Sequence, residues 1–145
     1  MSKTNKNTVT ENSFSNELLL SAEKRKSQSG AAMKAFVRMM KEWGMSVDQS
    51  RAILGSVPKP TYHKWASGNV STLSRDQLER ISITLGIYKA LTLIFNDGSG
   101  RLRWFKNKNH DYAFRGKSPV ERMVDGSMKD LYDVREYLNG MRGAH

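Results

Sequence analysis

The 145-residue sequence contains no cysteine, which excludes disulfides, thiolate metal sites and thiol nucleophiles. Long apolar runs are also missing, since none approaches the roughly 18 residues that a membrane span needs. The N-terminus lacks the basic and then apolar pattern of a secretory signal. Together these features predict a cytoplasmic protein with no membrane segment, built as one domain or as one small domain with an appendage.

Catalytic patterns are missing as well. The three histidines, His63, His110 and His145, lie in separate segments and form no HxxxH or HExxH pattern, and the chain has no Gly-rich phosphate loop. Acidic residues near the C-terminus recur at the spacing of a solvated helix face with ordinary ion-pair partners. These residues are Asp130, Asp133 and Glu136, with Lys129 and Arg135 beside them. We therefore expect neither an enzyme nor a bound metal or cofactor.

The formal net charge is +10, and its distribution along the chain is uneven. Residues 101–117 carry six Lys and Arg against one acid, whereas residues 118–145 carry four against five. A strongly basic protein of this size favours nucleic acid as a partner, because clustered Lys and Arg attract phosphates. The alternative is that the basic block at 101–117 is only a solvated face.

Residues 1–30 are polar and predict a flexible arm. Within this arm, residues 15–26 are compatible with a short helix whose only apolar cluster is Leu18, Leu19 and Leu20. Three adjacent leucines make no deep apolar stripe, so this piece is expected to dock weakly or to form a dimer contact. Residues 27–30, rich in Ser and Gly, are expected to end the helix.

From residue 31 onward the apolar residues follow a helical period, and no strand-like alternation of useful length occurs. The sequence predicts an all-α fold with a helix-turn-helix domain at residues 31–97 and a small helical domain at residues 98–145. Gly86 is expected to separate two helices. The predicted helices of the first domain cover residues 31–43, 47–54, 60–65, 74–85 and 87–95.

Two short helices joined by a tight Gly-containing turn are typical of a helix-turn-helix, whose second helix enters the DNA major groove. Here residues 47–54 form the supporting helix and residues 60–65 the recognition helix. Tyr62 and Trp65 are three apart and are expected to point into the core. The residues expected to face DNA are Lys59, Thr61, His63 and Lys64, with Gln49 and Ser50 of the supporting helix near the DNA backbone. An ordinary helical bundle without DNA binding is the alternative.

The C-terminal segment predicts two helices. Ser118 and Pro119 suit the start of the first, Ser127 can cap the second, and Gly140 is expected to end it. So short a segment buries too little apolar surface to fold alone. It contains more apolar residues than one side of a pair of helices can bury. Some of them are therefore expected to pack on Trp104, Phe105 and Phe114, and the others to contact a partner protein.

Four segments in order resemble one family. They are PTYHKWASG at 60–68, LSRDQLERISITLGIYKALTLIF at 73–95, WFKNKNHDYAFRGKSPVERM at 104–123 and LYDVREYLNGMRG at 131–143. Together they resemble antitoxins of the Xre/MbcA/ParS type, which pair with RES-domain toxins in bacterial toxin–antitoxin systems. Where many relatives have a Pro-Asn pair after the Trp, this chain has Lys108 and Asn109.

The resemblance implies a mechanism. The family's toxins consume NAD, and the antitoxin is expected to neutralise its toxin by docking the C-terminal domain over the route to the active site. Through the helix-turn-helix, the complex is expected to bind its own promoter and repress transcription. The residues expected to bind toxin are Tyr132, Arg135, Tyr137, Leu138, Met141 and Arg142. We also expect residues 141–145 to form a flexible tail whose Arg142 occupies the site of the NAD phosphates.

Two other functions stay open on the residues alone. One is a stand-alone phage-type repressor whose C-terminal domain serves dimerisation or effector binding. The other is a basic RNA- or nucleoid-associated protein that uses the 101–117 block with Trp104, Phe105 and Tyr112 interleaved. If the protein binds an operator, as an antitoxin or as a stand-alone repressor, a homodimer is expected, because two-fold proteins match pseudo-palindromic operators.

Overall fold

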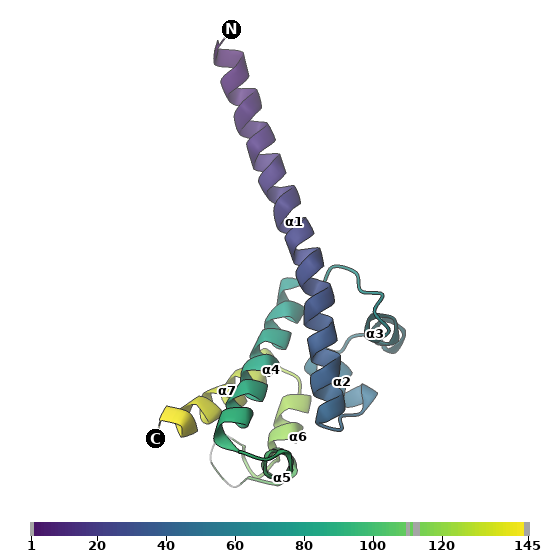
Figure 1. The fold of residues 1–145 in the computed structure, drawn as a ribbon, viewed down its shortest axis with the longest axis vertical. Coiled ribbons are helices and arrows are strands. Elements are labelled where there is room, and N and C mark those ends of the chain that lie inside the picture. The colour runs from purple at the N-terminus through teal and green to yellow at the C-terminus, as the bar shows by residue number, and fades with distance from the viewer. Residues whose placement is uncertain (1, 110, 112–113, 144–145) are drawn as a thin grey trace.

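A computed structural model describes residues 2–109, 111 and 114–143, with side chains from residue 21 onward. Within these ranges the chain forms seven helices and no strand, which confirms the all-α prediction. The helices are α1 (Ser2–Glu42), α2 (Val47–Ile53), α3 (Lys59–Ala66), α4 (Arg75–Ile94), α5 (Gly98–Lys106), α6 (Pro119–Val124) and α7 (Met128–Gly143). Figure 1 shows α1 as a long rod whose first half extends away from the other helices.

Helix α1 is continuous through residues 27–30, so the expected break there was wrong. Ser29 explains how a poor helix former is accommodated. Its hydroxyl donates to the Arg25 carbonyl at 2.6 Å and accepts the backbone N–H of Leu73 at 2.9 Å, and the residue is fully buried. The polar atom is therefore satisfied inside the core. Further along α1, Met33 and Phe36 anchor the helix on the body, since both are fully buried.

Helix α4 is also continuous, and the separation expected at Gly86 was wrong. The missing side chain at Gly86 serves packing instead. A Cβ atom placed there would lie 3.1 Å from Cδ of Arg135 on α7, which is closer than ordinary contact. The glycine thus costs about 1 kcal/mol of helix propensity but permits α7 to approach α4.

Helix α4 lies between α1 and α7, while α6 contacts α2, α5 and α7. The buried side chains form one cluster that runs through both halves of the chain. Trp43, directly after α1, contacts Phe105 of α5, with ring centroids 4.4 Å apart. The helix-turn-helix part and the C-terminal part therefore share one core, which holds their surfaces in a fixed relation.

Four serines cap helices as the sequence predicted, and one of them, Ser127, accepts the Asp130 backbone N–H at 3.0 Å. Ser46, Ser74 and Ser118 each accept a hydrogen bond at 3.1 Å from the backbone N–H three residues later. At α7 the expected end was wrong, because the helix continues through Gly140 to Gly143. Leu138 is fully buried and Met141 packs against the core, so tertiary contacts on both sides of Gly140 outweigh its low helix propensity.

Candidate DNA-binding and toxin-binding surfaces

Helices α2 and α3 form the predicted helix-turn-helix. The turn between them contains Gly55 and Ser56, whose φ angles are 96° and 62°. Nε of Arg51 donates to the Val57 carbonyl at 2.6 Å and so ties the turn to α2. Tyr62 is 5% exposed and Trp65 is 8% exposed, which confirms that both point into the core.

Helix α3 presents a basic outer face. Lys59, His63 and Lys64 are exposed and Thr61 is half-buried, so the predicted recognition residues are available to a partner. Tyr62 anchors the helix from behind. Burial raises the pKa of the Tyr62 phenol, while its hydrogen bond with Ser50 acts in the opposite direction.

The two residues expected from the supporting helix are placed differently. Ser50 is 2% exposed, and its hydroxyl donates to the Ser46 carbonyl at 2.8 Å, so its expected position near the DNA backbone was wrong. The reason is that Ser50 lies on the face of α2 that packs against Tyr62. Gln49 is half-buried, and its side-chain oxygen accepts the Ser46 N–H at 2.9 Å as part of the helix cap.

Arg80 joins the two halves of the chain, and the sequence reasoning missed it. Its Nη1 donates to the Gly126 carbonyl at 2.6 Å and to the Ile53 carbonyl at 3.4 Å. Its Nε pairs with Asp76 at 2.9 Å. The Asp76–Arg80 spacing of four was visible in the sequence. The contacts with the carbonyls of Ile53 and Gly126, which lie 27 and 46 residues away, could not be seen in the sequence.

An aromatic cluster organises the C-terminal half. The rings of Trp104 and Tyr137 stack with centroids 6.1 Å apart and an interplanar angle of 20°, and Phe114 meets Tyr137 edge-on at 4.8 Å. The Tyr137 hydroxyl donates to the Asp111 carboxylate, and this hydrogen bond is the main reason that the pKa of Tyr137 is raised. Tyr137 thus holds the segment before α6 against the core.

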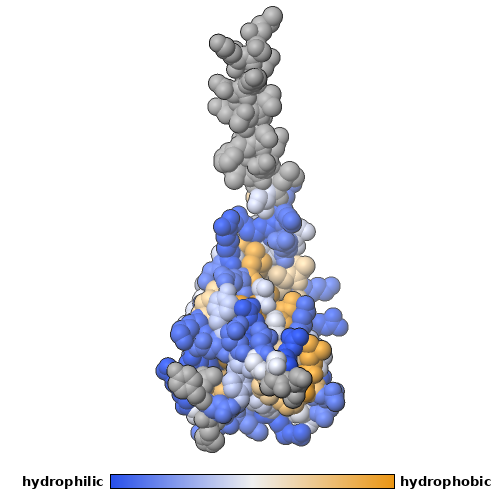
Figure 2. Space-filling view, turned by 90° about the vertical axis from the view of Figure 1, so that its left-hand side faces the viewer, coloured by the Kyte–Doolittle hydropathy of each residue, from blue (hydrophilic) through white to orange (hydrophobic). Residues whose placement is uncertain are grey.

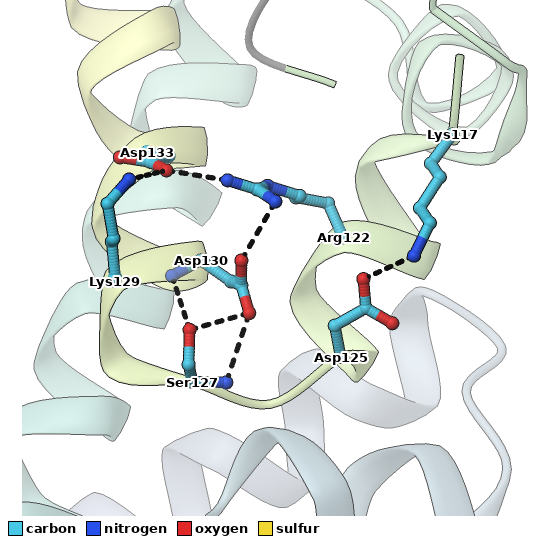
Figure 3. Close-up of polar contacts among 7 residues, drawn as sticks. All are labelled: Lys117, Arg122, Asp125, Ser127, Lys129, Asp130 and Asp133. Atoms are coloured by element: carbon cyan, nitrogen blue, oxygen red, sulfur yellow. Dashed lines mark hydrogen bonds and ion pairs between the residues drawn. The ribbon is translucent and has the colours of Figure 1, made fainter. Parts of the chain in front are cut away.

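Figure 3 shows an ionic cluster between α6 and α7. The Arg122 guanidinium pairs with Asp130 at 3.0 Å and with Asp133 at 2.6 Å, and Lys129 reaches Asp133 at 2.9 Å. The Arg122 and Asp130 side chains are only 11% and 14% exposed. The interpretation as a solvated face was therefore wrong for Asp130 and Asp133, which turn toward Arg122, and is confirmed for Glu136, which is exposed.

The cluster perturbs one carboxylate. Burial alone raises the pKa of Asp133, but hydrogen bonds from Lys129 and Arg122 outweigh it, and the pKa is lowered. Lys117 and Asp125 form a second ion pair at 2.7 Å beside this cluster (Figure 3). Their side chains are 48% and 42% exposed, so this second pair lies in solvent.

Arg135 does not pair with the acids beside it as expected. Its guanidinium carbon lies 4.8 Å from the Tyr132 ring centroid, and its side chain passes Gly86. The Tyr132 hydroxyl donates to Glu79 of α4 at 2.5 Å, which is the main cause of its raised pKa. Tyr132 and Arg135 are both half-buried, so each has a part of its surface left for a partner.

The remaining predicted toxin-binding residues, Leu138, Met141 and Arg142, differ in how much of each is exposed. Leu138 is fully buried, so its expected contact with toxin was wrong; it belongs to the core beside Leu131 and Val134. Met141 is half-buried and packs against that core. Arg142 is exposed in the last turn of α7. The expected flexible tail is therefore helical up to residue 143, and residues 144 and 145 lie outside the described part.

The described residues contain no group of three or more His, Asp or Glu placed to hold a metal ion. None of the described helices is long and apolar enough to cross a bilayer. What the surface does offer is an exposed basic helix face on α3 and a partly apolar, aromatic and basic face along α7. Figure 2 shows the side of the molecule on which α7 ends, where apolar areas lie among hydrophilic ones. The first suits nucleic-acid phosphates and base edges, and the second suits a protein.

Comparison with known families defines the class of protein to which this fold belongs. Residues 23–82 match the model of the antitoxin Xre-like helix-turn-helix domain, and residues 90–144 match the antitoxin Xre/MbcA/ParS C-terminal toxin-binding domain. The chain belongs to this antitoxin family, whose two domains are non-enzymatic. Helix α4 spans the end of the first match and the start of the second.

One relative is similar along most of the chain. It is described as "Uncharacterized protein y4oB" of Sinorhizobium fredii (strain NBRC 101917 / NGR234), and it is 36% identical over 113 residues. The aligned part covers 78% of this chain and 85% of the relative. The chain is thus an Xre-type antitoxin, with a helix-turn-helix that implies a DNA partner and a C-terminal domain that implies a toxin partner.

Proposed function

We propose that this antitoxin neutralises a RES-domain toxin that consumes NAD, by docking α7 and its surroundings over the route to the toxin's active site. The observation that carries the proposal is the position of the two surfaces. Figure 1 places the C-terminal end of α7 and the helix α3 on opposite sides of the molecule. One chain can therefore bind a toxin and DNA at the same time.

The proposed toxin contact uses the exposed parts of α7. Tyr132, Arg135 and Tyr137 are half-buried, and their polar atoms or neighbours hold them in fixed positions. Pre-oriented aromatic and Arg side chains are typical of interface hot spots, because little rotamer freedom is lost on binding. Met141 and the exposed Arg142 extend this surface to the end of the helix. Arg142 has the charge to occupy the site of the NAD phosphates.

Co-expression with a RES-domain toxin tests the neutralisation. The antitoxin is expected to restore both cell growth and the cellular NAD level, because it blocks substrate entry. Deleting residues 141–145 should weaken neutralisation while the fold is retained, since these residues follow the last fully buried anchor, Leu138. Full neutralisation by the truncated chain would remove the role given to Arg142. A toxin that is bound but stays active would count against the blocking mechanism.

We further propose that the protein binds its own promoter as a homodimer and represses transcription. Lys59 and Lys64 are both exposed on α3, but they offer few phosphate contacts, so tight binding needs two half-sites. Replacing both lysines by Ala should weaken promoter binding and reduce its salt dependence, while neutralisation persists. Arg103→Ala with Lys108→Ala is the matched control, because both residues are exposed and lie outside α3.

A further inference from the structure

Helix α1 is strongly divided by charge. Residues 7–23 contain three acids, Glu11, Glu17 and Glu23, and no Lys or Arg. Residues 24–41 contain six Lys and Arg and no acid. The same helix therefore carries an acidic segment and then a basic segment. The acidic segment also contains the apolar residues Phe14, Leu18, Leu19 and Leu20.

The basic segment borders a groove of about 910 Å³. Along α1 its lining runs from Gly30 to Lys41, about 16 Å at 1.5 Å per residue, which is the length of three helical turns. Half-buried apolar residues lie along it, with Val37 from α1 itself, Val70 from the segment before α4 and Leu85 from α4. At its far side lies the C-terminal end of α3.

The rim of the groove is basic. Lys34, Arg38 and Lys41 are exposed, and the residues that line the groove include no Asp or Glu. No ion pair within the described part of the chain uses these three residues. Such a groove fits a helix that brings apolar side chains for the floor and carboxylates for the rim.

Gly30 at one end of the groove adds to this argument. It lies inside α1, where glycine costs about 0.5–1 kcal/mol relative to alanine. A Cβ at Gly30 would meet nothing within 4 Å in this chain, so no contact of the described residues requires the glycine. A second helix approaching this point would make use of the small surface that Gly30 and Ala31 leave.

We propose that the acidic segment of α1, residues 7–23, docks in this groove of a second copy of the chain. It cannot reach its own groove, because both belong to one continuous helix. In an antiparallel pair of α1 helices the contact occurs twice, as a two-fold dimer requires. In this register, positions 11 and 17 of one copy fall opposite positions 41 and 34 of the other, and positions 18–20 fall opposite the part of the groove that contains Ala31 and Ala35. Near the axis, Glu23 of each copy offsets part of the charge of residues 24–26.

This inference deepens the proposed function, because it names the surface that makes the expected homodimer. Trp65, Ala66 and Gly68 at the end of α3 line the same groove. The docked segment would thus sit beside both recognition helices and set the distance between them. The groove is lined by α1, α4, the end of α3 and the segment before α4, and no residue of α7 lines it.

Charge reversal in the full chain tests the proposal by sedimentation velocity. The wild type is expected to be a dimer at micromolar concentration. Glu11→Lys with Glu17→Lys, and separately Lys34→Glu with Lys41→Glu, should each weaken dimerisation by at least about tenfold, because each places like charges together at two symmetric contacts. An equimolar mixture of the two variants should form a heterodimer, in which both contacts regain opposite charges.

Exposed residues of the C-terminal half provide controls with the same change of charge. Arg103→Glu with Lys108→Glu, and Glu121→Lys with Glu136→Lys, should leave the dimer unchanged. Circular dichroism distinguishes loss of the dimer from loss of the helix. A monomeric wild type, reversal variants that dimerise as the wild type does, or a mixture that stays monomeric would each overturn the proposal. Neutralisation assays on the two α1 reversal variants report on the toxin function separately, since those variants do not alter α7.

Discussion

The ionic cluster between α6 and α7 makes the sharpest prediction about stability. Arg122 is the central cation, and removing it as Arg122→Met leaves Asp130 without a counter-charge, with only hydrogen bonds from Ser127, in a site where the Asp130 side chain is only 14% exposed. Breaking a buried pair in this way costs about 3–5 kcal/mol. The cost is expected at or below the lower end, about 2–3 kcal/mol, because Asp133 keeps Lys129 and is 30% exposed.

The second ion pair in Figure 3 is the matched control. Lys117 and Asp125 are 2.7 Å apart, closer than Arg122 and Asp130 at 3.0 Å, but their side chains are 48% and 42% exposed. Water screens such a pair, so Lys117→Ala should cost less than about 1 kcal/mol. Distance does not separate the two sites, because Arg122 also lies 2.6 Å from Asp133, whereas burial does separate them. The comparison therefore tests whether burial governs the strength of these pairs.

Urea titration gives the free energy of unfolding of both variants and a thermal melt gives the midpoint, each followed by circular dichroism. Arg122→Met should lower the thermal midpoint by roughly 4–12 °C for a chain of this size, and Lys117→Ala by at most about 4 °C. Adding Asp130→Asn to Arg122→Met should recover much of the loss, because it removes the uncompensated charge. A cost for Arg122→Met within about 0.5 kcal/mol of that for Lys117→Ala would refute the reasoning.

Three further predictions follow from single residues. Leu138→Ala should cost about 2–5 kcal/mol of unfolding free energy, measured by urea titration, because the side chain is fully buried in the core. Gly126→Ala should destabilise the fold, since φ is 85° and the added Cβ would lie 3.3 Å from the Ala52 carbonyl oxygen. Gly140→Ala should instead stabilise it by about 0.5–1 kcal/mol, because an added Cβ there has nothing within 4 Å. Thermal midpoints of the two variants that shift in the same direction would contradict this. The pKa of Asp133 is lower in the folded state than in the unfolded state, where it is about 4. Ionised Asp133 therefore stabilises the fold above about pH 4, and this contribution is lost as the pH falls through the folded-state pKa. Asp133→Asn should make the stability less dependent on pH below about pH 4.

Local sequence chemistry was enough to place most helices. Ser46, Ser74 and Ser118 are caps in the sequence and in the structure, because a cap depends only on a hydroxyl and an N–H three residues later. The direction of Tyr62 and Trp65 was equally predictable, since two large apolar residues three apart must share a face. The family resemblance of the quoted segments was likewise a property of the sequence and is confirmed by the matched domains.

Only the tertiary structure decided what the ambiguous residues do. Gly86 and Gly140 have the local signature of a helix end, but packing on α7 and on the core carries both helices through them. The sequence predicts Ser50 and Leu138 as surface residues, because local pattern gives no measure of long-range burial. Arg80 and Arg122 find their partners across the fold, and a sequence does not show which distant groups a long, flexible cation will reach. Helix caps and hydrophobic periodicity depend on a few neighbouring residues, so the sequence alone determines them. Burial and long-range ion pairs form only when the helices pack together, so only the tertiary structure decides them.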